Sequence, residues 1–133
     1  MSLSKPRFSK NYEWELARFC NKINYKVVGG ASKLLKYFEE NYNPKSLVSY
    51  ADLRWSYGEL YTILGFSLKN TSLPAYWYWK TSNKLHHRTE FQKHKLKNIL
   101  EKFDENLSEY ENMRINGYNR IFDCGNLVFV KTY

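Results

Sequence analysis

A pair of adjacent glycines, Gly29 and Gly30, stands between a predicted strand and a predicted helix, and it constrains the fold more than any other feature. Residues 12–19 alternate between the two faces of an extended chain, as a half-buried strand does. Apolar side chains then recur every four positions through residues 31–42, which predicts an amphipathic helix directly after the glycines. Residues 46–51 are short and apolar enough to form a central strand. This order predicts an α/β (α+β) chain with a mixed sheet.

A second, shorter helix is expected after these elements. Ser56 is well placed to cap it, the helix runs to about Leu64, and Gly65 is expected to end it in the left-handed conformation. A third strand begins at Phe66, and the four aromatic residues 76–79 form a further candidate strand.

The last third of the chain has a different pattern. Apolar residues between 96 and 107 have helical spacing. Two candidate strands, 118–122 and 127–130, flank the tetrad Asp123–Asn126, whose composition is typical of a hairpin turn. We therefore expect a C-terminal helical segment followed by a β-hairpin.

Composition favours an anionic partner. The formal net charge is +8, and aromatic residues make up 18% of the chain. A basic surface attracts nucleic acid or a phosphorylated cofactor, and aromatic rings can stack on bases. The alternatives are that the rings fill a core and that the protein is basic without a polyanionic partner. A membrane is the weakest candidate partner, because no apolar run approaches the ~20 residues that a span needs. The two cysteines, Cys20 and Cys124, lack metal-ligand spacing and are expected to be free thiols in the cytoplasm.

The segment Lys26–Ala31 resembles the acetyl-CoA loop of the GNAT acyl-CoA N-acyltransferase family. That loop has Gln or Arg first, then two residues, Gly, any residue, and Gly or Ala; here Lys26 stands in the first position. A second segment, Trp55–Phe66, resembles the same family's late motif, a short helix with a tyrosine followed by Leu-Gly-Phe and a strand. The spacing of the two segments, one helix and one strand apart, also fits the family. The resemblance covers roughly residues 12–70.

The resemblance implies a cofactor site and catalytic residues. It implies that acetyl-CoA or a related acyl-CoA binds at Val28, Gly29, Gly30, Ala31 and Ser32, where small residues and a helix N-terminus suit a pyrophosphate. It further implies that Tyr61 protonates the departing CoA thiolate, although ordinary helix packing is an equal alternative for this side chain.

Three carboxylates are candidates for work on the acceptor. Glu13 or Glu15 lies where the family often keeps a general base, and either is alternatively a solvated strand face. Asp52 follows the second strand, where open α/β sheets place ligand contacts. It either orients an amine or pairs with Arg54.

A narrower resemblance involves residues 18–22, 29–34, 49–56 and 123–126. These segments are similar to a phage-encoded domain related to Mom-type DNA-modification proteins, which have the acyltransferase fold and act on adenine in DNA. The same kind of domain occurs downstream of nuclease domains in phage homing-endonuclease-like proteins. This resemblance singles out Asp52, Ser56 and Tyr61, and it implies a phage-infected or prophage-carrying bacterial cell.

The family normally has several elements before the strand that opens this chain, whereas eleven residues precede Tyr12 here. Activity of this chain alone is therefore in doubt. We expect a flexible lead over residues 1–11 and a partial, acyltransferase-like half-domain over residues 12–80. Residues 81–133 are expected to form the basic helical segment and hairpin, packed on the same domain.

A basic run from Lys80 to Lys97 holds six Lys or Arg and three His against one acidic residue. It follows the aromatic strand, and this combination suits phosphate contacts with adjoining stacking. The alternative is a solvated charged face. The residues expected to contact nucleic acid are Trp77, Trp79, Lys84, Arg88, Lys93 and Lys97.

No metal site is expected. His87, Glu90 and His94 would share a helical face, but the cations around them repel a metal ion.

Two functions remain open from the sequence. One is a phage DNA-modification or DNA-processing domain that uses an acyl-CoA cofactor and a DNA base as acceptor. The alternative is a non-catalytic DNA-binding module of a phage homing-endonuclease-like protein. A scaffold or dimerisation domain is a third possibility.

Overall fold

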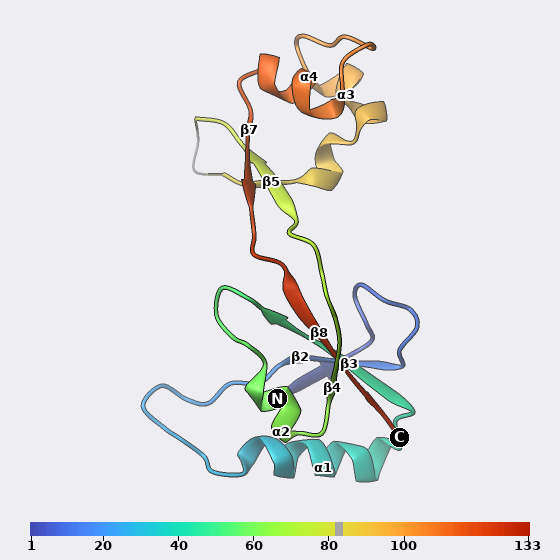
Figure 1. The fold of residues 1–133 in the computed structure, drawn as a ribbon, viewed down its shortest axis with the longest axis vertical. Coiled ribbons are helices and arrows are strands. Elements are labelled where there is room, and N and C mark those ends of the chain that lie inside the picture. The colour runs from blue at the N-terminus through green and yellow to red at the C-terminus, as the bar shows by residue number, and fades with distance from the viewer. Residues whose placement is uncertain (82–83) are drawn as a thin grey trace. The chain divides into compact units, whose positions relative to one another are not determined.

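The computed structural model describes residues 1–81 and 84–133 and divides the chain into two compact units (Figure 1). Unit 1 comprises Met1–Leu73 together with Gly125–Tyr133, and unit 2 comprises Pro74–Cys124. Unit 2 is thus inserted in the sequence of unit 1. Both units combine helices and strands, so the predicted α+β class is confirmed.

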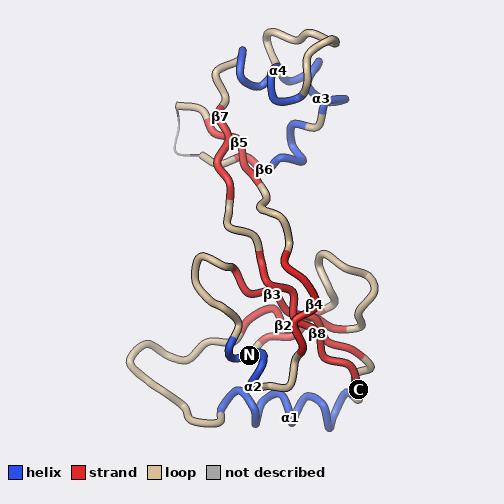
Figure 2. Tube along the Cα trace, in the orientation of Figure 1, coloured by secondary structure: helices blue, strands red, loops and turns tan. Residues whose placement is uncertain are grey.

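Unit 1 is built on a mixed five-stranded sheet in the order β1-β2-β3-β8-β4. Figure 2 draws the strands in red. Strands β2 and β3 are parallel, and the other neighbours are antiparallel. The strands are β1 (Ser2–Ser4), β2 (Trp14–Arg18), β3 (Ser46–Asp52), β4 (Ser67–Thr71) and β8 (Asn126–Thr132).

Helix α1 (Gly30–Tyr42) connects β2 to β3, and it lies where the apolar repeat predicts a helix. Ala31, Leu35 and Phe38 form its buried stripe. Asn43 ends it in the left-handed conformation, and its N–H group donates to the carbonyl of Glu39. The helix packs on a single core of unit 1, whose buried members are Leu16, Ala31, Leu35, Phe38, Leu47, Ala51, Leu64, Phe66 and Phe129.

The N-terminal segment expected as a lead instead supplies the edge strand β1, which pairs antiparallel with β2. Its sequence is too short and too polar to carry a strand pattern by itself. Pairing with β2 satisfies its backbone groups, and the side chain of Leu3 packs on the unit 1 core.

Unit 2 contains a three-stranded antiparallel sheet in the order β6-β5-β7. Tyr78, Phe91, Leu96 and Met113 form its buried core. Its elements are β5 (Tyr76–Trp79), β6 (His86–His87), the 3-10 helix η1 (Arg88–Phe91), α3 (Lys93–Ile99), α4 (Glu109–Ile115) and β7 (Asn119–Phe122).

The apolar spacing from 96 to 107 therefore does not correspond to one helix, because α3 ends at Ile99 and α4 begins only at Glu109. The buried amide of Asn112 organises the turn between them. It accepts from the N–H of Asp104 at 2.8 Å and donates to the carbonyls of Asp104, Leu107 and Ser108.

The predicted C-terminal hairpin is wrong. Strand β7 pairs with β5 in unit 2, whereas β8 pairs with β3 and β4 in unit 1. The tetrad between them does contain a left-handed glycine, Gly125 at φ +77°, as a turn requires. However, Asp123 exchanges hydrogen bonds with Ala75, and the carbonyl of Gly125 accepts from Leu53. The local turn chemistry therefore serves a crossover between two sheets.

Helix α2 (Glu59–Ile63) is held against the sheet by a close approach at Gly58. Gly58 has φ +79°, and a Cβ atom placed there would lie 2.2 Å from the ring of Phe129. Because Phe129 is buried in the core, its ring has little room to move.

We predict that Gly58→Ala destabilises unit 1 by about 2–4 kcal/mol, because left-handed strain adds to overpacking. Gly29→Ala is the matched control. It has a similar φ of +69° but no atom within 4 Å of the added Cβ, so it should cost only about 1 kcal/mol. Denaturant unfolding measures both, and equal losses for the two variants would contradict the close approach.

Candidate functional site

The backbone ladder between the parallel strands β2 and β3 ends before the strands do. Their ladder consists of two pairs, Trp14 with Leu47 and Glu15 with Val48. Beyond these pairs, the buried hydroxyl of Ser49 donates to the carbonyl of Leu16 at 2.7 Å. A side chain thus takes the place of the next ladder bond, and the strands continue to Arg18 and Asp52 without a further backbone pair between them.

The glycine pair forms the turn that opens α1, as the sequence predicts. Gly29 precedes the helix in the left-handed conformation, and Val28 before it is 87% exposed. The first helical bond joins the N–H of Lys33 to the carbonyl of Gly29, so the N–H groups of Ala31 and Ser32 have no intrahelical acceptor. No side chain caps this end of the helix. These N–H groups are therefore suited to an anionic ligand.

The positive charge around this turn is uncompensated. Residues 18–38 contain five Lys or Arg and no Asp or Glu. Arg18, Lys22, Lys26 and Lys33 are exposed, and within residues 1–81 and 84–133 none of them has an ion-pair partner. Cations at this density raise the local concentration of phosphorylated ligands.

Tyr61 lies on α2 and is half-buried against the unit 1 core. Its ring centroid is 5.1 Å from that of Phe129 and 5.8 Å from that of Phe66. Tyr61 therefore packs on the core, which is one of the two roles that the sequence left open for this side chain. Proton transfer by its hydroxyl remains a prediction.

Asp52 ends β3 and pairs with Arg54. Its carboxylate accepts from the backbone N–H of Arg54 at 2.9 Å and from the guanidinium at 2.6 Å. These hydrogen bonds, the side-chain ones first, lower the pKa of Asp52 below its ordinary value. Of the two roles that the sequence left open for Asp52, the structure shows the pairing with Arg54.

The prediction that Ser56 caps α2 is wrong. The helix begins three residues later, after Gly58. Instead, the hydroxyl of Ser56 accepts from the N–H of Gly58 at 3.0 Å and shapes the loop before the helix.

Glu15 is buried rather than solvated, so the strand-face alternative is wrong for this residue. One carboxylate oxygen accepts from the N–H of Arg7 at 2.8 Å, and the other accepts from its guanidinium at 2.6 and 2.9 Å. Both oxygens are thus committed to Arg7, a residue in the segment that the sequence analysis had set aside as a lead. A single charged position on a strand gives no signal for a partner eight residues earlier.

The residues expected to bind nucleic acid lie on several elements of unit 2. Trp77 and Trp79 lie on the face of β5 opposite the buried Tyr78, because side chains alternate along a strand. Lys93 and Lys97 contact Glu105 instead, through its carbonyl and its carboxylate respectively.

The two remaining cations lie elsewhere. The guanidinium of Arg88 lies 5.7 Å from the ring centroid of Tyr76. Hydrogen bonds from His86 and from the N–H of His87 lower the pKa of Glu90, and the charge of Lys84 adds a smaller effect in the same direction. None of these contacts joins two of the six residues, and their binding to nucleic acid remains a prediction. Moreover, unit 1 has twelve Lys and Arg against six Asp and Glu, whereas unit 2 has nine against seven.

A carboxylate of unit 2 is held by two tyrosines. The hydroxyls of Tyr76 and Tyr78 both donate to Glu109, at 3.1 and 2.9 Å. Arg120 donates to the Tyr78 oxygen at 2.9 Å and lies over the ring of Tyr110 at 4.1 Å. Burial and the neighbouring carboxylate raise the pKa of Tyr78. This network stabilises the join between β5, α4 and β7.

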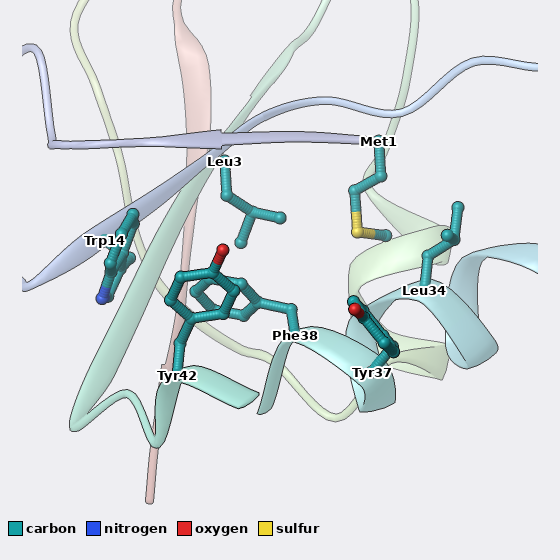
Figure 3. A pocket seen from close by; sticks show the side chains of 7 residues that line it. All are labelled: Met1, Leu3, Trp14, Leu34, Tyr37, Phe38 and Tyr42. Atoms are coloured by element: carbon teal, nitrogen blue, oxygen red, sulfur yellow. The ribbon is translucent and has the colours of Figure 1, made fainter. Parts of the chain in front are cut away.

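An apolar pocket of about 280 Å³ lies between β1, β2 and residues 34–42 of α1 (Figure 3). The indole N–H of Trp14 is buried without a hydrogen-bond partner in the part of the chain that the structure describes. No sequence pattern indicates this pocket, because Met1 and Leu3, which help to line it, belong to the segment expected as a lead. It is lined by Met1, Leu3, Trp14, Leu34, Tyr37, Phe38 and Tyr42.

Neither a metal centre nor a membrane span is found among residues 1–81 and 84–133. No group of three His, Cys, Asp or Glu side chains could hold a metal ion there. Glu90, from the metal face considered above, instead accepts from the N–H of His87 and bonds to the ring of His86. No helix in the same ranges combines the length and apolar character that crossing a bilayer requires.

Comparison with protein-family models, with curated proteins and with solved structures finds no match for this chain. The function proposed below therefore depends on the geometry of the site.

The pairing of Asp52 with Arg54 gives a pH prediction. Because the folded-state pKa of Asp52 is lowered, its contribution to stability is present above the ordinary value of 3.8 and is lost as the pH falls through the lower, folded-state value. We expect Arg54→Ala to raise the pKa of Asp52 back toward 3.8. A carbon-13 NMR titration of the Asp52 carboxyl measures this change. The control is Lys69→Ala, which removes a cation that bonds to Tyr12 and should leave the pKa of Asp52 lowered.

Proposed function

We propose that this chain is a DNA-modification or DNA-processing domain of acyl-CoA N-acyltransferase type, related to phage proteins. The single observation that supports it best is the setting of α1. A glycine turn opens the helix that follows β2, the backbone ladder between β2 and β3 ends after two pairs, and the N–H groups of Ala31 and Ser32 lack intrahelical acceptors. This is the geometry that a diphosphate needs.

The residues present fit such a cofactor. A Cβ added at Gly29 would meet nothing within 4 Å, so a phosphate can approach the backbone from that side. The acid-free segment from residue 18 to 38 adds the positive charge that a nucleotide-bearing cofactor requires. We assign pyrophosphate binding to the backbone of Val28, Gly29, Gly30, Ala31 and Ser32.

A bound acyl-CoA supplies a thioester whose acyl group an amine can accept. In this reaction the Tyr61 hydroxyl would donate its proton to the departing sulfur, and the resulting phenolate would take the proton that the amine releases as the amide forms. Asp52, fixed by Arg54, helps to position the exocyclic amine of a DNA base at the carboxyl edge of β3. Glu15 stabilises the sheet through Arg7 rather than acting as a base, because both of its oxygens are already bonded. Ser56 shapes the loop that leads to α2.

Ser32→Glu separates cofactor binding from helix stability. Ser32 is exposed in the first turn of α1, which contains no acidic residue. A carboxylate there should stabilise the helix by about 0.3–1 kcal/mol through the helix dipole. It should also weaken acetyl-CoA binding roughly tenfold or more, because it repels the diphosphate at close range. Calorimetric titration and thermal unfolding of the same samples measure the two effects.

Asn41→Glu is the control, since it makes the same change in net charge on the same helix, about 13 Å further along the axis. It should leave the heat of acetyl-CoA binding unchanged. Equal affinity of Ser32→Glu and the parent protein would place the cofactor elsewhere, and a parent protein without any heat of binding would remove the proposed function.

A second candidate function is a non-catalytic DNA-binding module of a phage homing-endonuclease-like protein. The observation that favours it is the sheet face of unit 2 that carries Trp77 and Trp79. Trp79 is 41% exposed, and its neighbour across the ladder toward β7, Asn119, is exposed too. An exposed ring that is followed in the sequence by a basic run suits stacking on bases.

This second function predicts DNA binding without acetyl-CoA and with a steep salt dependence. The logarithm of the affinity should fall linearly with the logarithm of salt concentration, with a slope of about −0.9 for each phosphate contacted on a duplex. Trp79→Ala should weaken binding, whereas Ile115→Ala, an exposed apolar residue on α4, should not. Fluorescence anisotropy measures both, and an affinity that stayed flat across salt would count against DNA binding.

A further inference from the structure

The loop that joins β3 to α2 leaves two large aromatic side chains in solvent. Trp55 is 82% exposed and Tyr57 is 80% exposed. In the described part of the chain neither ring contacts another aromatic ring or a cation. Packed rings of this size bury substantial area, so the fold gains little from these two. Single exposed apolar residues are common, and exposure by itself indicates no binding site.

The backbone that carries these rings is fixed. The N–H groups of Trp55 and Ser56 both donate to the carbonyl of Asp52, at 2.9 and 3.0 Å. The N–H of Leu53 donates to the carbonyl of Gly125 at 3.1 Å. These bonds tie the loop to the ends of β3 and β8. The two exposed rings are therefore carried by a loop whose backbone is fixed by hydrogen bonds, whereas surface loops are generally more mobile.

The far end of the loop is fixed as well. The N–H of Gly58 donates to the Ser56 hydroxyl at 3.0 Å, and Gly58 lies directly on the buried ring of Phe129. Preorganisation of this kind lowers the entropy lost when a ligand binds, which favours a surface built for recognition.

The surroundings of the loop select an anionic ligand. Because β2 and β3 are parallel, the loop after β2 and the loop after β3 leave the sheet at the same edge, as Figure 1 shows. The first of these loops carries Lys22 and Lys26, and Arg18 immediately precedes it. It also carries an exposed ring, Tyr25, with the Lys22 ammonium 5.1 Å from its centroid. Rings and unpaired cations together are typical of surfaces that bind single-stranded nucleic acid.

An aromatic side chain can stack only on a base whose face is free. In a duplex both faces of each base are covered by its neighbours, so a base reaches such a ring only when it is unpaired or extruded from the helix. On the basis of the proposed function, which places DNA at this edge, we propose that Trp55 and Tyr57 form a stacking site for an unpaired DNA base. The acceptor is accordingly a base in single-stranded DNA or one extruded from a duplex, and Arg18, Lys22 and Lys26 contact its flanking phosphates.

Fluorescence anisotropy with a labelled oligothymidylate and a blunt duplex of matched length tests this proposal on the full chain at low salt. The parent protein should bind the single strand more tightly than the duplex. Trp55→Ala and Tyr57→Ala should each weaken single-strand binding roughly tenfold, with little change for the duplex. Because both side chains are exposed, circular dichroism and thermal unfolding should be unaltered. Tyr37→Ala is the matched control, since Tyr37 is 65% exposed on α1 and should leave both affinities as they are.

Three outcomes would overturn the stacking site. The first is a parent protein that does not prefer the single strand, and the second is a pair of variants that bind it as tightly as the parent. The third is a loss of acetyl-CoA binding in Trp55→Ala without a loss of DNA affinity, which would assign the ring to the adenine of the cofactor. Failure of the proposed function looks different. There the parent protein gives no heat with acetyl-CoA, while its single-strand binding still depends on Trp55.

Discussion

The ladder between β3 and β8 is the interaction on which unit 1 depends. It joins seven residue pairs, from Ser46 with Thr132 to Asp52 with Asn126. Because β8 lies between β3 and β4, the last residues of the chain complete the centre of the sheet rather than its edge. Through this ladder, Gly125 accepts the N–H of Leu53, and Phe129 supports both Gly58 and Tyr61. The loop after β3 and helix α2 therefore derive their positions from a strand that lies more than sixty residues later in the sequence.

Local patterns predicted the elements whose causes are local. Helix α1, strand β3 and the left-handed Gly65 follow from apolar period, strand length and backbone freedom, and each is found close to where it was expected. The turn at Gly29 also follows from adjacent residues alone. The fold class was accessible for the same reason, since it depends on the order of elements rather than on their partners.

The missed features all depend on partners that are distant in the sequence. Gly125 has the backbone conformation of a turn, but which strands β7 and β8 pair with is decided by β5, β3 and β4. The sequence pattern indicates a surface position for Glu15, but this side chain is buried and forms an ion pair with Arg7, eight residues earlier. The basic run in unit 2 is similarly misleading, because acidic residues between 101 and 111 offset much of its charge. The larger excess of cations lies in unit 1, where they are spread along the sequence and form no run.

Unit 2 brings its own ends together, since the backbone N–H groups of Ala75 and Asp123 each bond to the other residue. A disordered segment of that length would make the pairing of β4 with β8 entropically costly, because the cost of closing a loop grows with the number of free residues in it. Once unit 2 has folded, those residues are no longer free. The β4 and β8 segments are then already neighbours, so the entropy cost of pairing them is lower than the number of intervening residues suggests.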